Sequence, residues 1–254
     1  MKAIILAAGE GSRLRPLTNS KPKCLVELAG KPLLDWQIDA LRRCGVRDIV
    51  VVRGYRADRI ERADVRFYDN PSYATTNMVA SLWRAAGEFT EDIVVSYADI
   101  VYAGEVLAAL INCPKDIAVV VDRKWKPYWE ERFEDPLSDA ESLKIDSQGN
   151  ITSIGQKPDA LSEIEGQYIG LMKFTKGGLK LIQESYDNAI SGEKAWGQSK
   201  PVERAYMTDL LQGLILEGIP VRAVEVSGGW LEIDSLSDYE LAKKYIVDGA
   251  IRRG

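Results

Sequence analysis

The chain has 254 residues, 46% of them hydrophobic and 28% charged, which is the composition of an ordinary soluble globular protein with a sizeable core. Its formal net charge of −5 argues against a general nucleic-acid binder, because such proteins present a basic face. Histidine is absent, which removes histidine-based catalytic triads and histidine metal sites. Any general base must therefore be a carboxylate, lysine, tyrosine or cysteine, or the reaction must need none.

Cysteine usage and the first residues bear on location. Cys24, Cys44 and Cys113 are odd in number and lack metal-ligand spacing, which favours a reduced, cytoplasmic protein. The apolar run near the start is too short to cross a membrane, and Arg13 and Arg15 follow it on the wrong side for a signal peptide. We therefore expect no association with a membrane.

Strand and helix patterns alternate along most of the chain. Short apolar runs predict buried strands at 3–8, 48–52, 65–68, 93–95, 117–121, 168–174, 221–226 and 230–233. Amphipathic segments predict helices at 31–44, 58–62, 77–86, 103–110, 176–190, 203–217 and 235–251. This rhythm predicts an α/β, Rossmann-like fold: a doubly wound, mainly parallel sheet flanked by helices. Since no linker or repeat interrupts it, we expect residues 1–254 to form a single domain.

One segment breaks the alternation. Residues 122–139 are aromatic, charged and irregular, as an active-site insertion or lid would be. The runs at 143–145 and 151–154, joined through Gln148-Gly149-Asn150, predict a hairpin. Together these stretches predict a small insertion around residues 122–158.

The first strand leads into a glycine-containing loop, Gly9-Glu10-Gly11-Ser12-Arg13. Glycine lets the backbone approach a ligand closely, and the N–H groups of such a loop can surround phosphate oxygens. Two familiar phosphate loops do not match. Leu14 stands where the dinucleotide fingerprint needs a third glycine, and Gly30-Lys31 is followed by Pro32 where a P-loop needs Ser or Thr.

What remains is the pattern G-x-G-S-R-L-x-P-L-T, followed by Pro22-Lys23. It closely resembles the signature of the sugar-nucleotidyltransferase family, whose members join a nucleoside triphosphate to a phosphorylated small molecule. The resemblance implies that Arg13 and Lys23 are catalytic and neutralise phosphate charge. It also implies nucleotide contacts from Leu6, Ala7, Ala8, Gly9, Gly11, Ser12 and Arg13. The alternative is an ordinary glycine-rich turn.

Two acidic sites extend the resemblance. Asp99 follows the strand at 93–95, at the sheet edge where ligands bind in doubly wound folds. Asp234 lies in the run Trp230-Leu231-Glu232-Ile233-Asp234, which resembles the closing strand of the family. The resemblance implies that Asp99 and Asp234 hold Mg²⁺, with Glu232 as a third candidate ligand. The alternative is that both aspartates only cap helices.

The base and acceptor sites are less sharply indicated. Tyr73, Asn77 and Ser81 resemble the cytosine-binding segment of the phosphocholine cytidylyltransferase branch, although Asn77 is also a natural helix cap. Trp125, Tyr128 and Trp129, with acidic neighbours, suit a cationic acceptor through cation–π attraction, unless they simply anchor the segment to the core. Further acceptor candidates are Arg132, Lys157 in Gln156-Lys157-Pro158, and Asp209. Where this chain has Gln156-Lys157-Pro158, many hexose-1-phosphate members of the family have Glu-Lys-Pro, so the missing carboxylate weakens a specific sugar assignment.

The resemblance carried by these residues implies a magnesium-dependent enzyme that transfers CMP from CTP to a phosphorylated small acceptor and releases pyrophosphate. The acceptor would be phosphocholine, phosphoethanolamine or an aminoalkylphosphonate, in the making of a cell-surface precursor. A phosphate monoester is already anionic, so its attack needs no general base. The alternatives are a sugar-1-phosphate nucleotidyltransferase using UTP or dTTP, and a regulatory subunit that binds nucleotide without turnover. A homodimer is possible.

Overall fold

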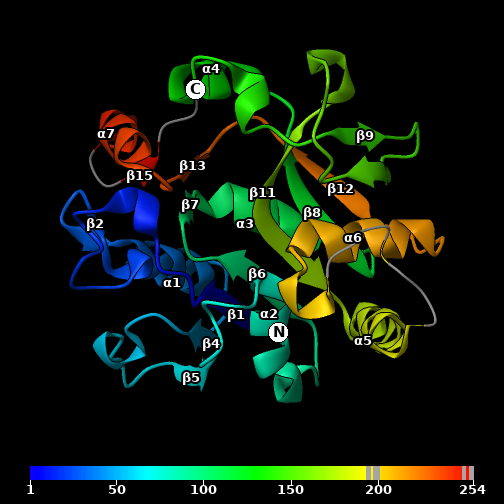
Figure 1. Ribbon diagram of the computed structural model, residues 1–254, viewed down its shortest axis with the longest axis horizontal. Helices are drawn as coiled ribbons and strands as arrows, with labels where there is room; N and C mark the ends of the chain where they lie inside the picture. The colour runs from blue at the N-terminus through cyan, green and yellow to red at the C-terminus, as the bar shows by residue number, and fades with distance from the viewer. Residues whose placement is uncertain (193–195, 197–200, 248–249, 252–254) are drawn as a thin grey trace.

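The computed structural model describes residues 1–192, 196, 201–247 and 250–251. A seven-stranded sheet runs through these residues in the order β12-β8-β11-β6-β1-β4-β5 (Figure 1). β11 is antiparallel to both of its neighbours, and the remaining adjacent pairs are parallel. The strands are β1 (Lys2–Ala7), β4 (Asp48–Arg53), β5 (Arg66–Asp69), β6 (Ile93–Tyr97), β8 (Ile117–Asp122), β11 (Gln167–Phe174) and β12 (Arg222–Val226).

The central strand β1 shows why the sheet is buried on both faces. Ile4 lies opposite Val50 of β4 on one side and Val95 of β6 on the other. Successive side chains of β1 alternate between two hydrophobic clusters, with Ile5 in one and Ile4 in the other. A continuous apolar run is therefore what this position requires.

Helices cover both faces of the sheet (Figure 1). α1 (Leu33–Arg43) and α3 (Gly104–Asn112) pack on the cluster that contains Ile5, to which they contribute Ile38 and Leu107. The helices α2 (Met78–Arg84), α5 (Lys176–Ser191) and α6 (Met207–Leu216) pack on the other cluster. The expected α/β fold with a mainly parallel sheet is confirmed.

Smaller elements complete the fold. β7 (Ile100–Tyr102) pairs with β13 (Trp230–Glu232), and α4 (Trp125–Arg132) packs beside α7 (Leu236–Tyr245). The other short strands are β2 (Glu27–Leu28), β3 (Lys31–Pro32), β9 (Leu143–Ile145), β10 (Ile151–Ile154), β14 (Ile246–Val247) and β15 (Ala250–Ile251). The 3-10 helices are η1 (Ser12–Leu14), η2 (Lys23–Leu25), η3 (Ala57–Arg59), η4 (Ala86–Glu88), η5 (Pro136–Ser138), η6 (Leu161–Glu163) and η7 (Val202–Arg204).

The expected hairpin is confirmed as β9 and β10, but the segment before it differs from expectation. Residues 122–139 are not irregular throughout, because α4 occupies their centre. Its buried residues Trp125, Trp129 and Arg132 recur at helical spacing. Pro127 is tolerated because it lies in the first turn, where an N–H has no partner within the helix.

Other boundaries also shift. The helix expected at 203–217 begins only at Met207, because the Tyr206 N–H donates to Asp209 Oδ2 at 2.8 Å and the two residues form a capping box. The helix expected at 235–251 ends at Tyr245, and residues 248 and 249 of that range lie outside the described residues. The strand at 230–233 pairs with β7 rather than with the main sheet. The helix expected at 58–62 is only the 3-10 turn at 57–59. None of the described helices has the length and apolar character needed to cross a membrane.

Candidate active site

A cleft of about 280 Å³ opens at the carboxyl ends of β1 and β6. These strands are parallel neighbours, so the segments that follow them meet at one edge of the sheet. The residues expected to bind nucleotide all line this cleft, together with Lys23, Asp99 and Asp234. They are Leu6, Ala7, Ala8, Gly9, Gly11, Ser12, Arg13, Tyr73, Asn77 and Ser81.

Backbone geometry explains the second glycine of the loop. Gly11 has a φ of 66°, which side chains rarely adopt, and a Cβ there would lie 2.8 Å from Cβ of Lys23. The Thr18 hydroxyl donates to the Gly11 carbonyl at 2.9 Å and fixes the turn. Leu14, which follows in η1, is fully buried in a third hydrophobic cluster and anchors the loop. The loop is thus held close to Lys23.

Lys23 joins the two predicted acidic sites. Its ammonium donates to Asp99 Oδ2 at 2.8 Å and to Asp234 Oδ1 at 2.5 Å. Arg13 forms an ion pair with the other oxygen of Asp234. Burial opposes the charge of Lys23, but the two carboxylates outweigh it and raise its pKa, so the ammonium stays protonated. The structure therefore brings Arg13, Lys23, Asp99 and Asp234 together.

The same pair of carboxylates fits a divalent cation. Asp99 Oδ1 is buried and has no hydrogen-bond partner among the described residues, so one carboxylate oxygen is left for a ligand. Within the described part of the chain, no three His, Cys, Asp or Glu side chains form a metal cluster. Mg²⁺ commonly binds through one or two carboxylates and completes its shell with phosphate oxygens and water. Asp99 and Asp234 match that donor set.

Glu232, the third metal candidate, is placed elsewhere. Its carboxylate Oε2 lies 2.7 Å from Nη1 of Arg132, and its side chain lines a second cavity rather than the cleft. Burial raises the pKa of Glu232 to about 7 against the opposing effect of Arg132, and the charges of Asp99 and Asp234 add to the increase.

The second cavity, of about 190 Å³, adjoins the cleft, since Met78 and Tyr97 line both. Its walls are aromatic and acidic. Of the acceptor residues expected from the sequence, only Trp129 lines it. The other residues used below are Trp230, Tyr168, Asp139, Glu141 and Gln167.

The remaining acceptor candidates have other surroundings. Trp125 is buried in the core, and the Tyr128 hydroxyl accepts the Glu232 N–H at 3.0 Å. Arg132 is buried between two carboxylates, so its guanidinium does not face either cavity. Lys157 is exposed and lines neither cavity, while Asp209 is buried at the start of α6 in the capping box. The structure does not bring these five residues together with the cleft.

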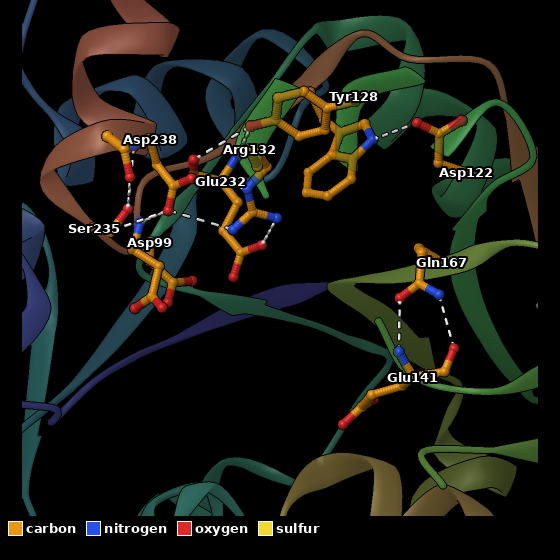
Figure 2. Close-up of polar contacts among 12 residues, drawn as sticks. Asp99, Asp122, Tyr128, Arg132, Glu141, Gln167, Glu232, Ser235 and Asp238 are labelled. Carbon is orange, nitrogen blue, oxygen red and sulfur yellow. Dashed lines mark hydrogen bonds and ion pairs between the residues drawn. The ribbon is translucent and has the colours of Figure 1, made fainter. Parts of the chain in front are cut away.

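Sequence reasoning missed several residues of the second cavity. Gln167 donates to the Glu141 carbonyl at 2.7 Å and accepts the Glu141 N–H at 3.3 Å, which fixes the backbone of Glu141 beside the cavity (Figure 2). Trp230 donates to Asp122 at 2.9 Å. Burial raises the pKa of Asp139. Only Trp230 had a usable signal, because it lies two residues from Glu232 and so shares its side of the strand.

Asn77 both caps a helix and lines the cleft. Its side chain accepts the Met78 N–H at 2.9 Å and so caps α2, and it also lines the cleft. Nearby, Asn70 donates to the Ser81 hydroxyl at 3.0 Å. The helix-cap and cleft-lining roles of Asn77 are therefore compatible.

Comparison with known proteins gives the family. Residues 3–151 match the family described as the MobA-like NTP transferase domain. The chain belongs to this family. It is a nucleotidyltransferase, as the resemblance of the loop and acidic motifs implied.

Individual relatives agree with this assignment. The chain is 42% identical over 252 residues to the CTP:phosphoglutamine cytidylyltransferase of Campylobacter jejuni, covering 95% of this chain and 98% of that one. It is 41% identical over 99 residues to the choline-phosphate cytidylyltransferase of Streptococcus pneumoniae, or 37% of this chain and 43% of that protein. A solved structure of the CTP:phosphocholine cytidylyltransferase from Streptococcus pneumoniae has the same fold, with a TM-score of 0.71 and 23% identity over 96% of this chain and 97% of that one.

Proposed function

We propose that this nucleotidyltransferase transfers CMP from CTP to a phosphorylated small acceptor and releases pyrophosphate. The observation that carries the proposal is the cluster at the cleft, where Lys23 bridges Asp99 and Asp234 beside Arg13. The similarity to the Campylobacter jejuni enzyme along nearly the whole chain supports CTP as the donor. For cytosine, we propose contacts from Tyr73, Asn77 and Ser81, which line the same cleft.

The chemistry needs charge neutralisation more than proton transfer. An oxygen of the acceptor phosphate attacks the α-phosphorus of CTP, the bond to the β-phosphate breaks, and pyrophosphate leaves. Mg²⁺ held by Asp99 and Asp234 would supply Lewis-acid neutralisation of the triphosphate. Arg13 and Lys23 bind and orient phosphate oxygens, and their fixed charges stabilise the negative charge that builds up on the leaving group.

The second cavity is the proposed site for the rest of the acceptor. Because it adjoins the cleft, an acceptor lying there can direct its phosphate towards the nucleotide. Trp129 and Trp230 offer aromatic faces and Asp139 and Glu141 offer carboxylates, which together suit a cationic amine. A phosphoglutamine, with its α-ammonium, fits this description and is the acceptor of the relative that is 42% identical. Phosphocholine and phosphoethanolamine fit it as well.

Further features belong to the same proposal. We place the reaction in the cytoplasm, where nucleoside triphosphates are made, and this agrees with the unpaired state of Cys24, Cys44 and Cys113. We assign residues 1–254 to one catalytic domain in which the insertion around 122–158 serves the acceptor side.

A pyrophosphate-release screen tests the proposal. Four nucleoside triphosphates would be crossed with phosphoglutamine, phosphocholine, phosphoethanolamine, 2-aminoethylphosphonate and glucose 1-phosphate. We expect release with CTP and an amine-bearing acceptor, and only in the presence of Mg²⁺. Release with UTP or dTTP and the sugar phosphate would favour the sugar-nucleotide alternative. Tight CTP binding without release for any acceptor would favour a regulatory subunit.

A further inference from the structure

Arg132 is a buried cation that the proposed reaction does not use. Its side chain is only 1% exposed, at the end of α4. Nη1 lies 2.7 Å from Oε2 of Glu232, while Nε and Nη2 donate to the two oxygens of Asp238 at 2.9 and 3.3 Å (Figure 2). Glu232 and Asp238 flank Asp234 in the sequence. One guanidinium thus holds the chain on both sides of that residue.

Asp238 links Arg132 to the backbone of Asp234. Its Oδ2 accepts the Asp234 N–H at 3.2 Å and the Ser235 N–H at 2.9 Å. In return, the Asp238 N–H donates to the Ser235 hydroxyl at 3.1 Å, which completes a capping box at the start of α7. The carboxylate that binds Arg132 is therefore the same one that fixes the peptide of Asp234.

The other side of Asp234 is fixed as well. The Tyr128 hydroxyl accepts the N–H of Glu232 at 3.0 Å, and the guanidinium of Arg132 packs against the rings of Tyr128 and Trp129 at 5.4 and 4.8 Å from their centres. A planar guanidinium that binds a carboxylate through two parallel hydrogen bonds has a defined orientation, which an ammonium group lacks. Arg132 therefore fixes the orientation of the backbone around Asp234 and also balances the charge of the neighbouring carboxylates.

We propose that Arg132 and Asp238 are positioning residues for Asp234. They hold its backbone so that its carboxylate stays directed at Lys23 and at the divalent cation of the cleft. The inference rests on the proposed function in one respect, the role of Asp234 as a metal ligand. It assigns to Arg132 a task other than contact with the acceptor phosphate, because both sides of its fork already face carboxylates.

The test uses Asp238→Asn and Arg132→Lys, which keep the size or the charge of the residue but lose the paired hydrogen bonds. The dissociation constant of Mn²⁺ in the presence of CTP, without acceptor, is measured by electron paramagnetic resonance. The half-saturating Mg²⁺ concentration for turnover is measured beside it. We expect both to rise roughly 10- to 100-fold, the loss typical of residues that orient a metal ligand. At subsaturating Mg²⁺ both variants should turn over more slowly than the parent, and saturating Mg²⁺ should restore much of that rate.

The matched control is Glu88→Gln. Glu88 is also buried and accepts from both nitrogens of an arginine fork, that of Arg66, at 3.2 and 2.9 Å, but it does not line either cavity. A role limited to stability predicts that Asp238→Asn and Glu88→Gln both lower the unfolding temperature and leave Mn²⁺ affinity unchanged. Should Asp238→Asn fail to fold, Arg132→Lys decides the question by the same measurement.

Asp234→Asn separates the two ideas. If it weakens Mn²⁺ binding while the folded Asp238→Asn and Arg132→Lys variants bind Mn²⁺ like the parent, the positioning role is overturned and the proposed function stands. If Asp234→Asn itself binds Mn²⁺ like the parent, the metal assignment and the positioning role both fall. Weaker Mn²⁺ binding in Asp234→Asn and in a positioning variant, with Glu88→Gln unchanged, supports the inference.

Discussion

Lys23 and Asp234 lie 211 positions apart in the sequence, yet the Lys23 ammonium donates to the Asp234 carboxylate at 2.5 Å. Asp99 joins the same ammonium at 2.8 Å. The fold therefore assembles one charged cluster from η2, the turn after β6 and the segment after β13. An ammonium between two carboxylates compensates their repulsion, and a divalent cation can take over that task when the triphosphate arrives with its own negative charge.

The first prediction concerns the carboxylates. Asp99→Asn and Asp234→Asn should each remove nearly all turnover, because a neutral amide holds Mg²⁺ poorly. Steady-state rates and circular dichroism would be measured together, with the exposed Asp58→Asn as a control for a lost acidic charge. A variant that keeps full activity and still requires magnesium would show that its carboxylate is not a metal ligand.

The second prediction concerns the cations. Lys23→Ala and Arg13→Ala should lower kcat by roughly 10²-fold or more, the effect of losing one preorganised electrostatic donor. Arg15→Ala is the control, because Arg15 lies in the same loop but pairs with Glu10 and does not line the cleft. A rise in KM for CTP with kcat unchanged would mean that the two cations only bind substrate.

Most residues that line the cleft could be predicted because they are local in the sequence. Gly9 to Arg13 follow a buried strand directly, and Asp99 follows another strand that proves to be its parallel neighbour. The general rule for doubly wound sheets then places both at one edge. Asp234 could be predicted only from its resemblance to the closing strand of the family.

The second cavity, which we propose for the acceptor, depends on contacts distant in the sequence. Glu141 reaches the second cavity because Gln167 holds its backbone, and neither residue belongs to a periodic pattern. In α4, Trp125 and Trp129 recur at helical spacing, but Pro127 and the charged residues between them obscured that period. The antiparallel direction of β11 was equally hidden, since an apolar run does not reveal the direction of a strand.

The third prediction concerns the acceptor. Trp129→Phe, which keeps a ring against Arg132, and Glu141→Gln should raise KM for an amine-bearing acceptor and leave KM for CTP nearly unchanged. The rise should be roughly two- to fivefold for Trp129→Phe, since Phe is a weaker cation–π partner than Trp. Competition between phosphocholine and its neutral isostere would be measured in the parent and in both variants. Trp83→Phe, outside both cavities, is the aromatic control. Equal use of the two acceptors by the parent would rule out recognition of the cation.

The fourth prediction concerns stability in acid. Burial alone would raise the pKa of Glu88, but hydrogen bonds from Lys2, Arg66 and Tyr68 lower it from 4.5 to about 2. A lowered pKa stabilises the folded state above the unfolded-state pKa, and this contribution is lost as the pH falls towards the folded value. The free energy of unfolding should therefore fall between pH 5 and 2 by roughly 1–2 kcal/mol more in the parent than in Glu88→Gln, allowing for partial solvent screening. The free energy of unfolding would be measured by denaturant titration of both proteins at each pH. An equal fall in the two proteins would show that the hydrogen bonds of Glu88 do not lower its pKa.

In the proposed reaction, an oxygen of the acceptor phosphate attacks the α-phosphorus of CTP. This attack is tested most directly with an acceptor whose phosphate carries ¹⁸O in its non-bridging oxygens, incubated with the parent enzyme, CTP and Mg²⁺, and followed by mass spectrometry of both products. We predict one CDP-linked acceptor for each pyrophosphate, with all of the ¹⁸O in the CDP-linked product and none in pyrophosphate. Pyrophosphate that contains ¹⁸O, or CMP released in place of a CDP-linked product, would rule out this reaction.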